Sequence, residues 1–215
     1  MKSKLSESKK AIIADILEIE WHMFESVPNV NGKAACQEDK NTFRIMRSSQ
    51  LMEWPYDVLQ SYQADLSEAE KAGRNLMTEK YARMMASTSP KEYEMIKDKL
   101  MPLDENKIIL INKIAKTILE WRKTIAIKYP YVSDRGRPLY AAEDTPYITS
   151  FETYLKGELS TYSIRTLELY YDHLLNQKSK NINASEIILE NMVKQYGYAS
   201  LDEANEAIKK SIESL

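Results

Sequence analysis

Apolar residues recur along most of this chain at intervals of three and four, which is the spacing of one face of an α-helix. Alternation of apolar and polar residues, the pattern of a half-buried strand, is nearly absent. Only five glycines and seven prolines interrupt the 215 residues. The pattern therefore predicts an all-α fold, a single-domain bundle of seven to nine helices that covers residues 1–215.

Breaks in the periodicity set the expected helix boundaries. The expected helices cover about 5–27, 39–54, 56–72, 75–88, 89–102, 104–129, 147–177, 185–197 and 200–215. Side-chain oxygens of Asp39 or Asn41, Asp104 and Ser185 are placed to cap three of these helix starts. The last helix, 200–215, is highly charged, so we expect it to be peripheral to the core and to fray.

Several ionisable or amide side chains occupy positions on the expected apolar faces. These side chains are Glu20, Arg47, Gln50, Lys80, Arg122, Glu158 and Arg165. Because a buried charge without a partner costs several kcal/mol, such groups are normally paired. One interpretation is a structural ion network, or lysine and arginine heads that reach out to water. The other is a pocket in which Glu20 or Glu158 is held at a shifted pKa as general acid or base.

A proline- and arginine-rich loop over about residues 131–146 is the second candidate site. Arg135 and Arg137 flank a glycine, and two such guanidinium groups could clamp a carboxylate or phosphate. They could equally bridge to Glu143 and Asp144 and only fix the loop. In the pocket interpretation the catalytic candidates are Glu20 and Glu158. The ligand-binding candidates are Arg47, Gln50, Lys80, Arg135, Arg137, Asp144 and Tyr162.

Composition narrows the classes of function. Thirty basic and 32 acidic residues give a net charge of −2, so we expect no nucleic acid as the main partner. No run of about 18 apolar residues occurs, and the charged N-terminus lacks the apolar core of a signal peptide. The single cysteine, Cys36, excludes an internal disulfide and suits a reducing compartment. We expect a soluble, cytoplasmic protein that does not act at a membrane.

Motifs for metals and cofactors are missing. A di-iron helical bundle needs two Glu-x-x-His pairs, but Ile19 precedes His22 by three residues and Tyr170 precedes His173. The RGRP segment lacks the glycine-rich stretch and the lysine of a phosphate-binding loop. Cys36 has no base near it in the sequence, which favours a passive side chain over a nucleophile. We therefore expect no metal and no cofactor.

Five segments carry a family resemblance. They read EWHMF, CQEDKNTFRIMRSSQ, GRNLMTEKYARMM, RGRPLYAAEDTPYITSFETYLKGELSTYS and ENMVKQYGYASLDEA. Together they resemble a bacterial family known only as a domain of unknown function, number 4125, over roughly residues 17–206. The resemblance implies a mostly helical protein without an assigned activity. Some relatives lie beside or are fused to a nucleotidyltransferase-like domain, which implies a helical partner or substrate-binding module.

Two hypotheses of function follow. In the first, the protein binds or transforms a small polar, anionic molecule in a pocket lined by carboxylates and arginines. In the second, it is a non-catalytic helical module with a protein partner, such as a nucleotidyltransferase-like protein. A concave cavity lined by the named side chains would favour the first. A solid core in which these groups satisfy one another, with exposed apolar residues elsewhere, would favour the second.

Overall fold

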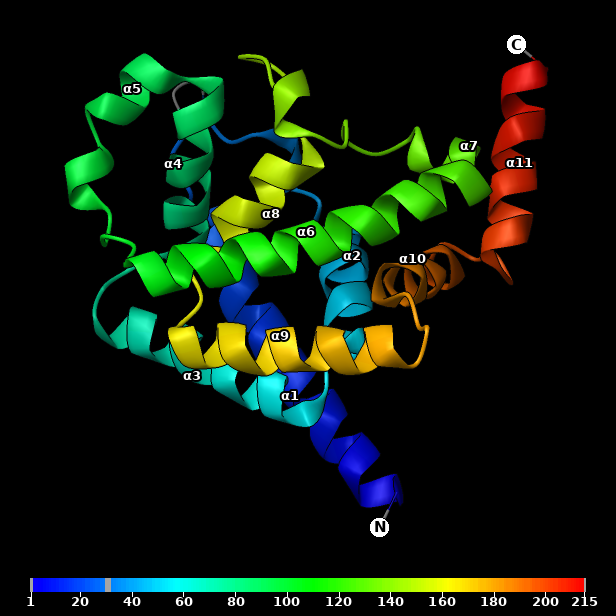
Figure 1. Cartoon of the computed structure of the whole chain (residues 1–215), viewed down its shortest axis with the longest axis horizontal. Helices are drawn as coiled ribbons and strands as arrows, with labels where there is room; N and C mark the ends of the chain where they lie inside the picture. The colour runs from blue at the N-terminus through cyan, green and yellow to red at the C-terminus, as the bar shows by residue number, and fades with distance from the viewer. Residues whose placement is uncertain (1, 30–31, 215) are drawn as a thin grey trace.

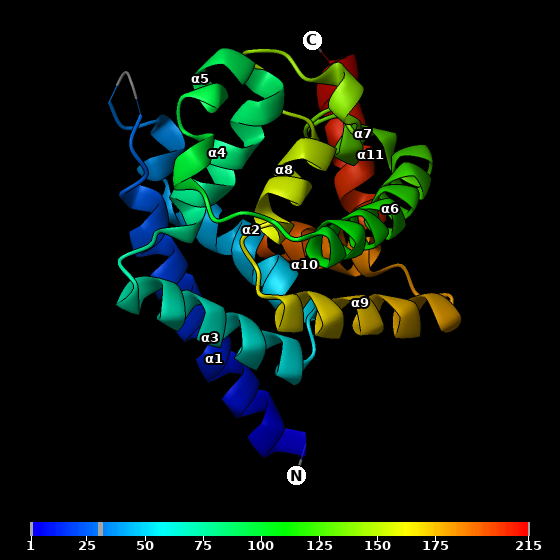
Figure 2. The same ribbon diagram turned by 60° about the vertical axis from the view of Figure 1, so that its left-hand side comes forward.

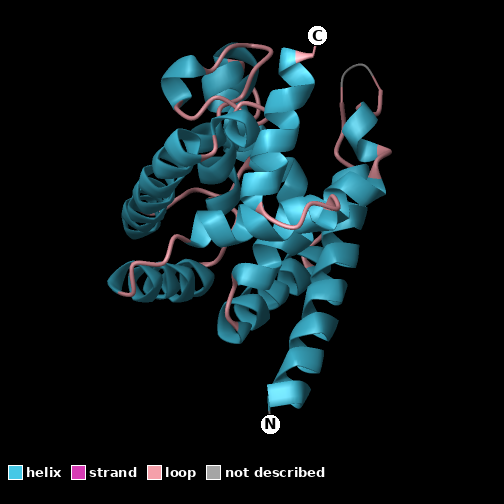
Figure 3. Ribbon diagram, turned by 90° about the vertical axis from the view of Figure 1, so that its right-hand side faces the viewer, coloured by secondary structure: helices cyan, strands magenta, loops and turns pink. Residues whose placement is uncertain are grey.

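The computed structural model describes residues 2–29 and 32–214, and every regular element in these ranges is helical (Figure 3). The α-helices are α1 (Lys2–Glu25), α2 (Lys40–Glu53), α3 (Tyr56–Lys71), α4 (Leu76–Thr88), α5 (Pro90–Glu94), α6 (Glu105–Lys128), α7 (Pro130–Ser133), α8 (Phe151–Leu159), α9 (Ile164–Ser179), α10 (Ala184–Gln195) and α11 (Leu201–Glu213). The all-α prediction is confirmed. The described residues form eleven α-helices where seven to nine were expected. The two additional helices arise because α7 lies in the segment read as a loop and because the helix expected over 147–177 is divided into α8 and α9.

Polar side chains cap most of the helix starts. Asp39 and Asp104 accept hydrogen bonds from backbone N–H groups in the first turns of α2 and α6, as expected. Helix α10 begins earlier than the sequence indicated, because Asn183 and not Ser185 caps it. These caps satisfy N–H groups that have no partner inside the helix, so they fix where each helix begins.

Helix α8 lies in the middle of the bundle, between α4 and α6 (Figures 1 and 2). Helix α6 packs on α8, α9 and α10, while α1 packs on α2, α3 and α4. Figure 1 shows the N-terminal end of α1 projecting from the body, far from the C-terminal end of α11. No helix in the described part of the chain is long and apolar enough to cross a bilayer.

The expected helix over 147–177 is wrong, because the chain breaks between α8 and α9. Ser163 caps α9 by accepting a hydrogen bond from the Thr166 backbone N–H at 3.1 Å. Asp65 of α3 accepts a second one from the Ser163 N–H at 2.9 Å. These bonds offer the backbone an alternative to continuing the helix. The break turns Arg165 to the surface, so its predicted inward position is also wrong.

Two apolar clusters stabilise the bundle. The larger one is built mainly from α1, α3, α6, α8 and α9, around fully buried side chains such as Trp54 and Ile114. The smaller one joins α6 and α10 to the first turn of α11, where Leu201 and Ala204 are buried. Asn205 of α11 also accepts hydrogen bonds from two backbone N–H groups of α7. The first turns of the C-terminal helix are therefore held against the body, and its end is exposed.

Helices α4 and α8 approach closely at Gly157. A Cβ added there would lie 2.9 Å from Met84 Cγ and 3.1 Å from the Lys80 carbonyl oxygen. A glycine in a helix interior reduces helix propensity, so its presence here reflects the close approach of the neighbouring backbone. The contact brings Lys80 of α4 beside Glu158 of α8.

Candidate functional site

The polar side chains expected on apolar faces meet in the interior around Arg47 of α2. The Arg47 guanidinium donates from Nε to Glu20 Oε2 at 2.8 Å and from Nη2 to Glu20 Oε1. Its Nη1 donates to Glu158 Oε1 at 2.8 Å and to Gln50 Oε1 at 2.7 Å. One guanidinium group therefore joins carboxylates from α1 and α8, which are far apart in the sequence.

A second cation completes this arrangement. Lys80 Nζ of α4 donates to Glu158 Oε2 at 2.7 Å. The exposed fractions are 0% for Glu20, 2% for Lys80, 4% for Glu158 and 6% for Arg47. Two carboxylates and two cations thus form a buried set with no net charge, which we call the core ion network (Glu20, Arg47, Lys80 and Glu158).

Two tyrosines and a glutamine complete the hydrogen bonding of the carboxylates. Tyr62 donates to Glu20 Oε1 at 2.7 Å, and Tyr162 donates to Glu158 Oε1 at 2.7 Å. Gln50 Nε2 donates to the same Glu158 oxygen at 3.3 Å. Each of the four carboxylate oxygens therefore has at least one donor, and the three nitrogens of the Arg47 guanidinium each have an acceptor. The core ion network is closed by groups of the protein itself.

For Glu158 and Arg47, the neighbouring opposite charges affect the pKa more strongly than burial does. Burial alone would raise the pKa of Glu158, but Arg47 and Lys80 outweigh it and hold the pKa far below its usual value. Burial opposes the charge of Arg47, but Glu158 and Glu20 raise its pKa. Burial, together with the adjacent carboxylates, raises the pKa of Tyr62 and Tyr162. At neutral pH Glu158 is ionised and the tyrosines are protonated, which matches the donor and acceptor roles above.

The loop candidates lie outside the core ion network. Arg137 is exposed, donates to the Thr149 carbonyl at 3.0 Å, and lies with Cζ 4.8 Å from the ring centre of Tyr154. Lys80 Nζ lies 3.6 Å from that same ring centre. Tyr154 thus connects the loop to the network, although it was not among the predicted site residues. Arg135 is exposed on the loop.

Asp144 fastens the loop to two helices. Its carboxylate accepts hydrogen bonds from the Ser87 hydroxyl of α4, the Thr153 hydroxyl of α8 and the Ser150 backbone N–H, each at 2.5 Å. Burial opposes the charge, but these donors outweigh it and lower the pKa of Asp144. The structure therefore connects Asp144 to protein groups other than Arg135 and Arg137.

Tyr62 was not among the predicted site residues, so its hydrogen bond to Glu20 in the network was missed. The available signal was its phenolic hydroxyl, because a buried tyrosine usually needs a hydrogen-bond partner. A second polar pair was also missed: Glu53 Oε1 lies 2.6 Å from His173 Nε2 and accepts from Gln177 at 3.1 Å. Glu53 Oε2 is buried without a hydrogen-bond partner.

Arg122 differs from Arg47, because no carboxylate of the described residues forms an ion pair with it. Its guanidinium lies over the Phe151 ring at 4.5 Å, and its buried Nε has no hydrogen-bond partner. Burial lowers the pKa of Arg122 to about 10. The expected inward position of Arg122 agrees with the structure, but the side chain takes no part in the core ion network.

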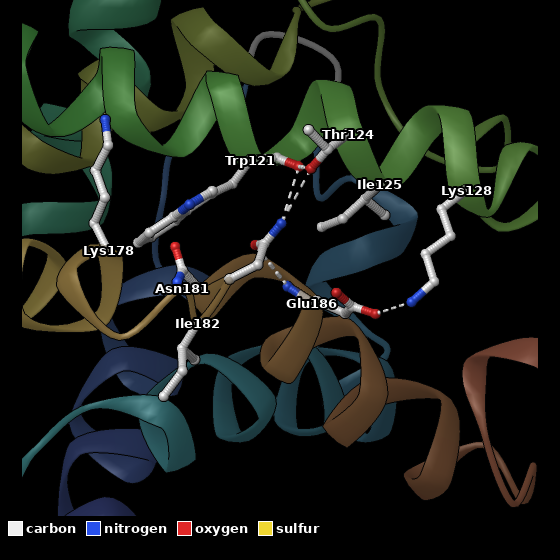
Figure 4. Close-up of a pocket in the computed structure, with 9 residues that line it drawn as sticks. Trp121, Thr124, Ile125, Lys128, Lys178, Asn181, Ile182 and Glu186 are labelled. Atoms are coloured by element: carbon white, nitrogen blue, oxygen red, sulfur yellow. Dashed lines mark hydrogen bonds and ion pairs between the residues drawn. The ribbon is translucent and has the colours of Figure 1, made fainter.

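Two surface hollows occur beside α6, and neither is lined by the core ion network. The first, of about 480 Å³, lies between the end of α6 and the α9–α10 turn (Figure 4). The second, of about 440 Å³, lies between α6 and the start of α8 and includes Tyr140, Glu152 and Lys156. Within the described ranges, no group of three or more His, Cys, Asp or Glu side chains could hold a metal ion.

Comparison with known proteins identifies a family for this chain. A family model described as "Protein of unknown function (DUF4125)" matches residues 10–206, which confirms the resemblance found in the sequence. No curated protein and no solved structure matches the chain. The match assigns no activity and no residue roles, so the catalytic and ligand-binding roles predicted for the site residues stay predictions.

We predict that Glu158 makes stability fall in acid. Its folded-state pKa is depressed, so its stabilising contribution is complete above its unfolded pKa of about 4.5 and is lost as the pH falls towards the folded value. In urea unfolding between pH 7 and pH 3, the wild type should lose stability more steeply below about pH 4.5 than Glu158→Gln. Equal slopes for the two proteins would contradict the prediction, and Glu18→Gln at an exposed ion pair serves as the control.

Arg122→Met should raise the free energy of unfolding by about 1 kcal/mol, because it replaces a partly buried, unpaired cation with an apolar side chain of similar length. The same change at Arg47 should lower it by about 3–5 kcal/mol, because two buried carboxylates lose their shared cation. Urea unfolding of both variants measures the difference. Destabilisation by Arg122→Met similar to that by Arg47→Met would show that Arg122 has a stabilising partner.

Proposed function

The chain belongs to the DUF4125 family of proteins of unknown function, and we propose that it is a non-catalytic helical module that acts through its surface. The proposal depends on one observation: the core ion network is buried, has no net charge and is hydrogen-bonded throughout by protein groups. A substrate would have to displace these internal bonds before it could reach either carboxylate.

The state of Glu158 supports the same proposal. A general acid or base works best when its pKa lies near the working pH. Arg47 and Lys80 hold the pKa of Glu158 far below that range, so the carboxylate is a poor base at neutral pH. A buried ion pair of this kind contributes little net stability against an apolar core of equal volume, but it penalises any packing that separates the charges. The network therefore favours one arrangement of the helices over alternatives that would separate its charges.

Exposed apolar side chains supply a surface for a partner. Met95, Met101, Ile108 and Ile109 are all exposed along the segment from the end of α5 to the start of α6. A contiguous exposed apolar surface is typical of protein contacts, and we place the proposed contact on this segment. We take a nucleotidyltransferase-like protein as the partner to test, because the family resemblance suggests it.

The first test asks whether an anion reaches the core ion network. Wild type and Lys80→Gln are heated with inorganic phosphate, succinate, citrate and AMP, and melting temperatures are compared with and without each anion. We expect no anion to stabilise the wild type more than the variant. A ligand at about 100 times its Kd stabilises by about 2.7 kcal/mol, so such binding would be visible.

Stabilisation of the wild type that Lys80→Gln abolishes would overturn the proposal and favour the pocket hypothesis. Tyr162→Phe provides a second variant, because it removes one hydrogen bond to Glu158 and keeps the ring. The two variants keep the test valid even if Lys80→Gln folds poorly.

The second test asks whether the exposed apolar residues at the start of α6 bind a partner protein. The chain is mixed at about 10 μM with a nucleotidyltransferase-like protein of the same genome, and complex formation is followed by sedimentation velocity. We expect a complex for the wild type and for Ile127→Lys, and its loss for Ile109→Lys. Both isoleucines are exposed on α6, so the pair is matched in chemistry. The absence of a complex, or its loss in both variants, would count against this surface.

A further inference from the structure

The hollow at the end of α6 has the size and composition of a small-molecule site. Its volume of about 480 Å³ lies within the range of about 300–1,000 Å³ that is typical of ligand sites. Figure 4 shows it between the last turns of α6 and the turn that joins α9 to α10. It shares no residue with the core ion network.

One wall of the hollow is apolar and aromatic. Trp121 and Ile125 of α6 line it, and in Figure 4 the Trp121 indole extends along it. The other two tryptophans, Trp21 and Trp54, are buried in the main apolar cluster, whereas Trp121 is partly exposed. A planar apolar group could therefore lie against Trp121 and lose contact with water.

The turn beside this wall is held in place by Asn183. Its Nδ2 donates to the Trp121 carbonyl and to Thr124 Oγ1, both at 3.2 Å, and its Oδ1 accepts from the Glu186 N–H at 3.1 Å. These bonds fasten the start of α10 to the last turns of α6. The shape of the hollow is therefore set without a ligand, as in most small-molecule sites.

The two ends of the hollow differ in how their polar side chains are bonded. At the Glu186 end, Lys128 is paired with Glu186 at 2.7 Å. At the other end, Lys178 forms an ion pair with Glu120 at 3.3 Å, and both side chains are more than half exposed. The Asn181 amide lines the hollow there too, and among the described residues no hydrogen bond to it is formed. This end therefore offers one amide without a hydrogen bond and one lysine in a long, exposed ion pair, which suits an anion.

The Asn181 amide lies at the hollow because Asn181 occupies the positive-φ position of the turn that ends α9. Three helices end with the same pair of backbone hydrogen bonds, and the residue with positive φ is Gly73 after α3, Gly197 after α10 and Asn181 after α9. Asparagine tolerates φ of 56° better than most residues. Only after α9 does this turn carry a side chain, and that side chain lines the hollow.

We propose that this hollow binds a small aromatic carboxylate, with its ring against Trp121 and its carboxylate on Lys178 and the Asn181 amide. The ring matches the apolar wall, and the negative charge matches the end where the lysine is held only by an exposed ion pair of 3.3 Å. A neutral ligand of the same shape would leave this end unused, and an anion without a ring would leave the wall exposed to water. The proposal is independent of the core ion network.

The test uses 2-naphthoate as the probe and follows the three tryptophan indole N–H signals in ¹H–¹⁵N spectra of the full chain. Trp121→Phe identifies the Trp121 signal. We expect 2-naphthoate to shift that signal in a saturable way, with a dissociation constant below about 1 mM. Lys178→Met should weaken binding by about tenfold or more, because it removes a charge-assisted hydrogen bond.

Lys180→Met is the matched control, since Lys180 is exposed two residues away and does not line the hollow. It should bind 2-naphthoate like the wild type. The neutral analogue 2-naphthylmethanol and acetate should each bind at least about tenfold more weakly than 2-naphthoate. Lys80→Gln should keep the binding, which separates this result from the test of the core ion network.

Four results would overturn the proposal: no saturable shift of the Trp121 signal, equal weakening by Lys178→Met and Lys180→Met, equal binding of 2-naphthylmethanol, or equal binding of acetate. Equal binding of the alcohol would show that the charge is not recognised. Equal binding of acetate would show that the aromatic wall contributes nothing. Trp121→Phe and Lys178→Met change partly or fully exposed side chains, so neither should prevent folding.

Discussion

The structure depends on the guanidinium of Arg47, which lies between two buried carboxylates. Its planar group offers hydrogen bonds in fixed directions, and in this protein they reach Glu20 on α1 and Glu158 on α8. Lysine at this position could not make the same set of bonds, because its ammonium group is a compact point charge. The geometry of one side chain therefore fixes how α1, α2 and α8 lie relative to one another.

The same constraint extends to neighbouring helices. Tyr62 brings α3 to Glu20, and Lys80 brings α4 to Glu158. Lys80 can reach because α4 approaches the backbone of α8 at Gly157. A ring contact from Arg137 to Tyr154, together with the hydrogen bonds of Asp144, then fastens the arginine-rich loop over α4 and α8. The loop is thus supported by the network without contributing a charge to it.

The buried core ion network and the features at the surface have different roles in this molecule. The groups of the core ion network satisfy one another, which suits a role in specifying the helix packing better than a role in catalysis. The surface features lie along α6, whose 24 residues span about 36 Å at about 1.5 Å per residue. Ile108 and Ile109 are near its start, and the Trp121 hollow is near its end. The proposed protein contact and the proposed ligand site therefore lie at separate places on one helix.

The sequence by itself determined the helical class, most helix boundaries and the inward position of the network side chains, because these depend on local periodicity and capping. It placed Glu20, Arg47, Lys80 and Glu158 on apolar faces, and burial then required them to have partners. It misread the break after α8, since the Asp65 bond that supports this break comes from a distant helix.

Only the tertiary structure decided which charges meet. Arg47 pairs with two carboxylates, whereas Arg122, which looked equivalent in the sequence, lies over Phe151 with its Nε unpaired. Helical periodicity tells which side of a helix faces inward, but not which helix lies opposite. Pairing between residues 27 and 111 positions apart is set by packing, and that information does not reside in any one segment.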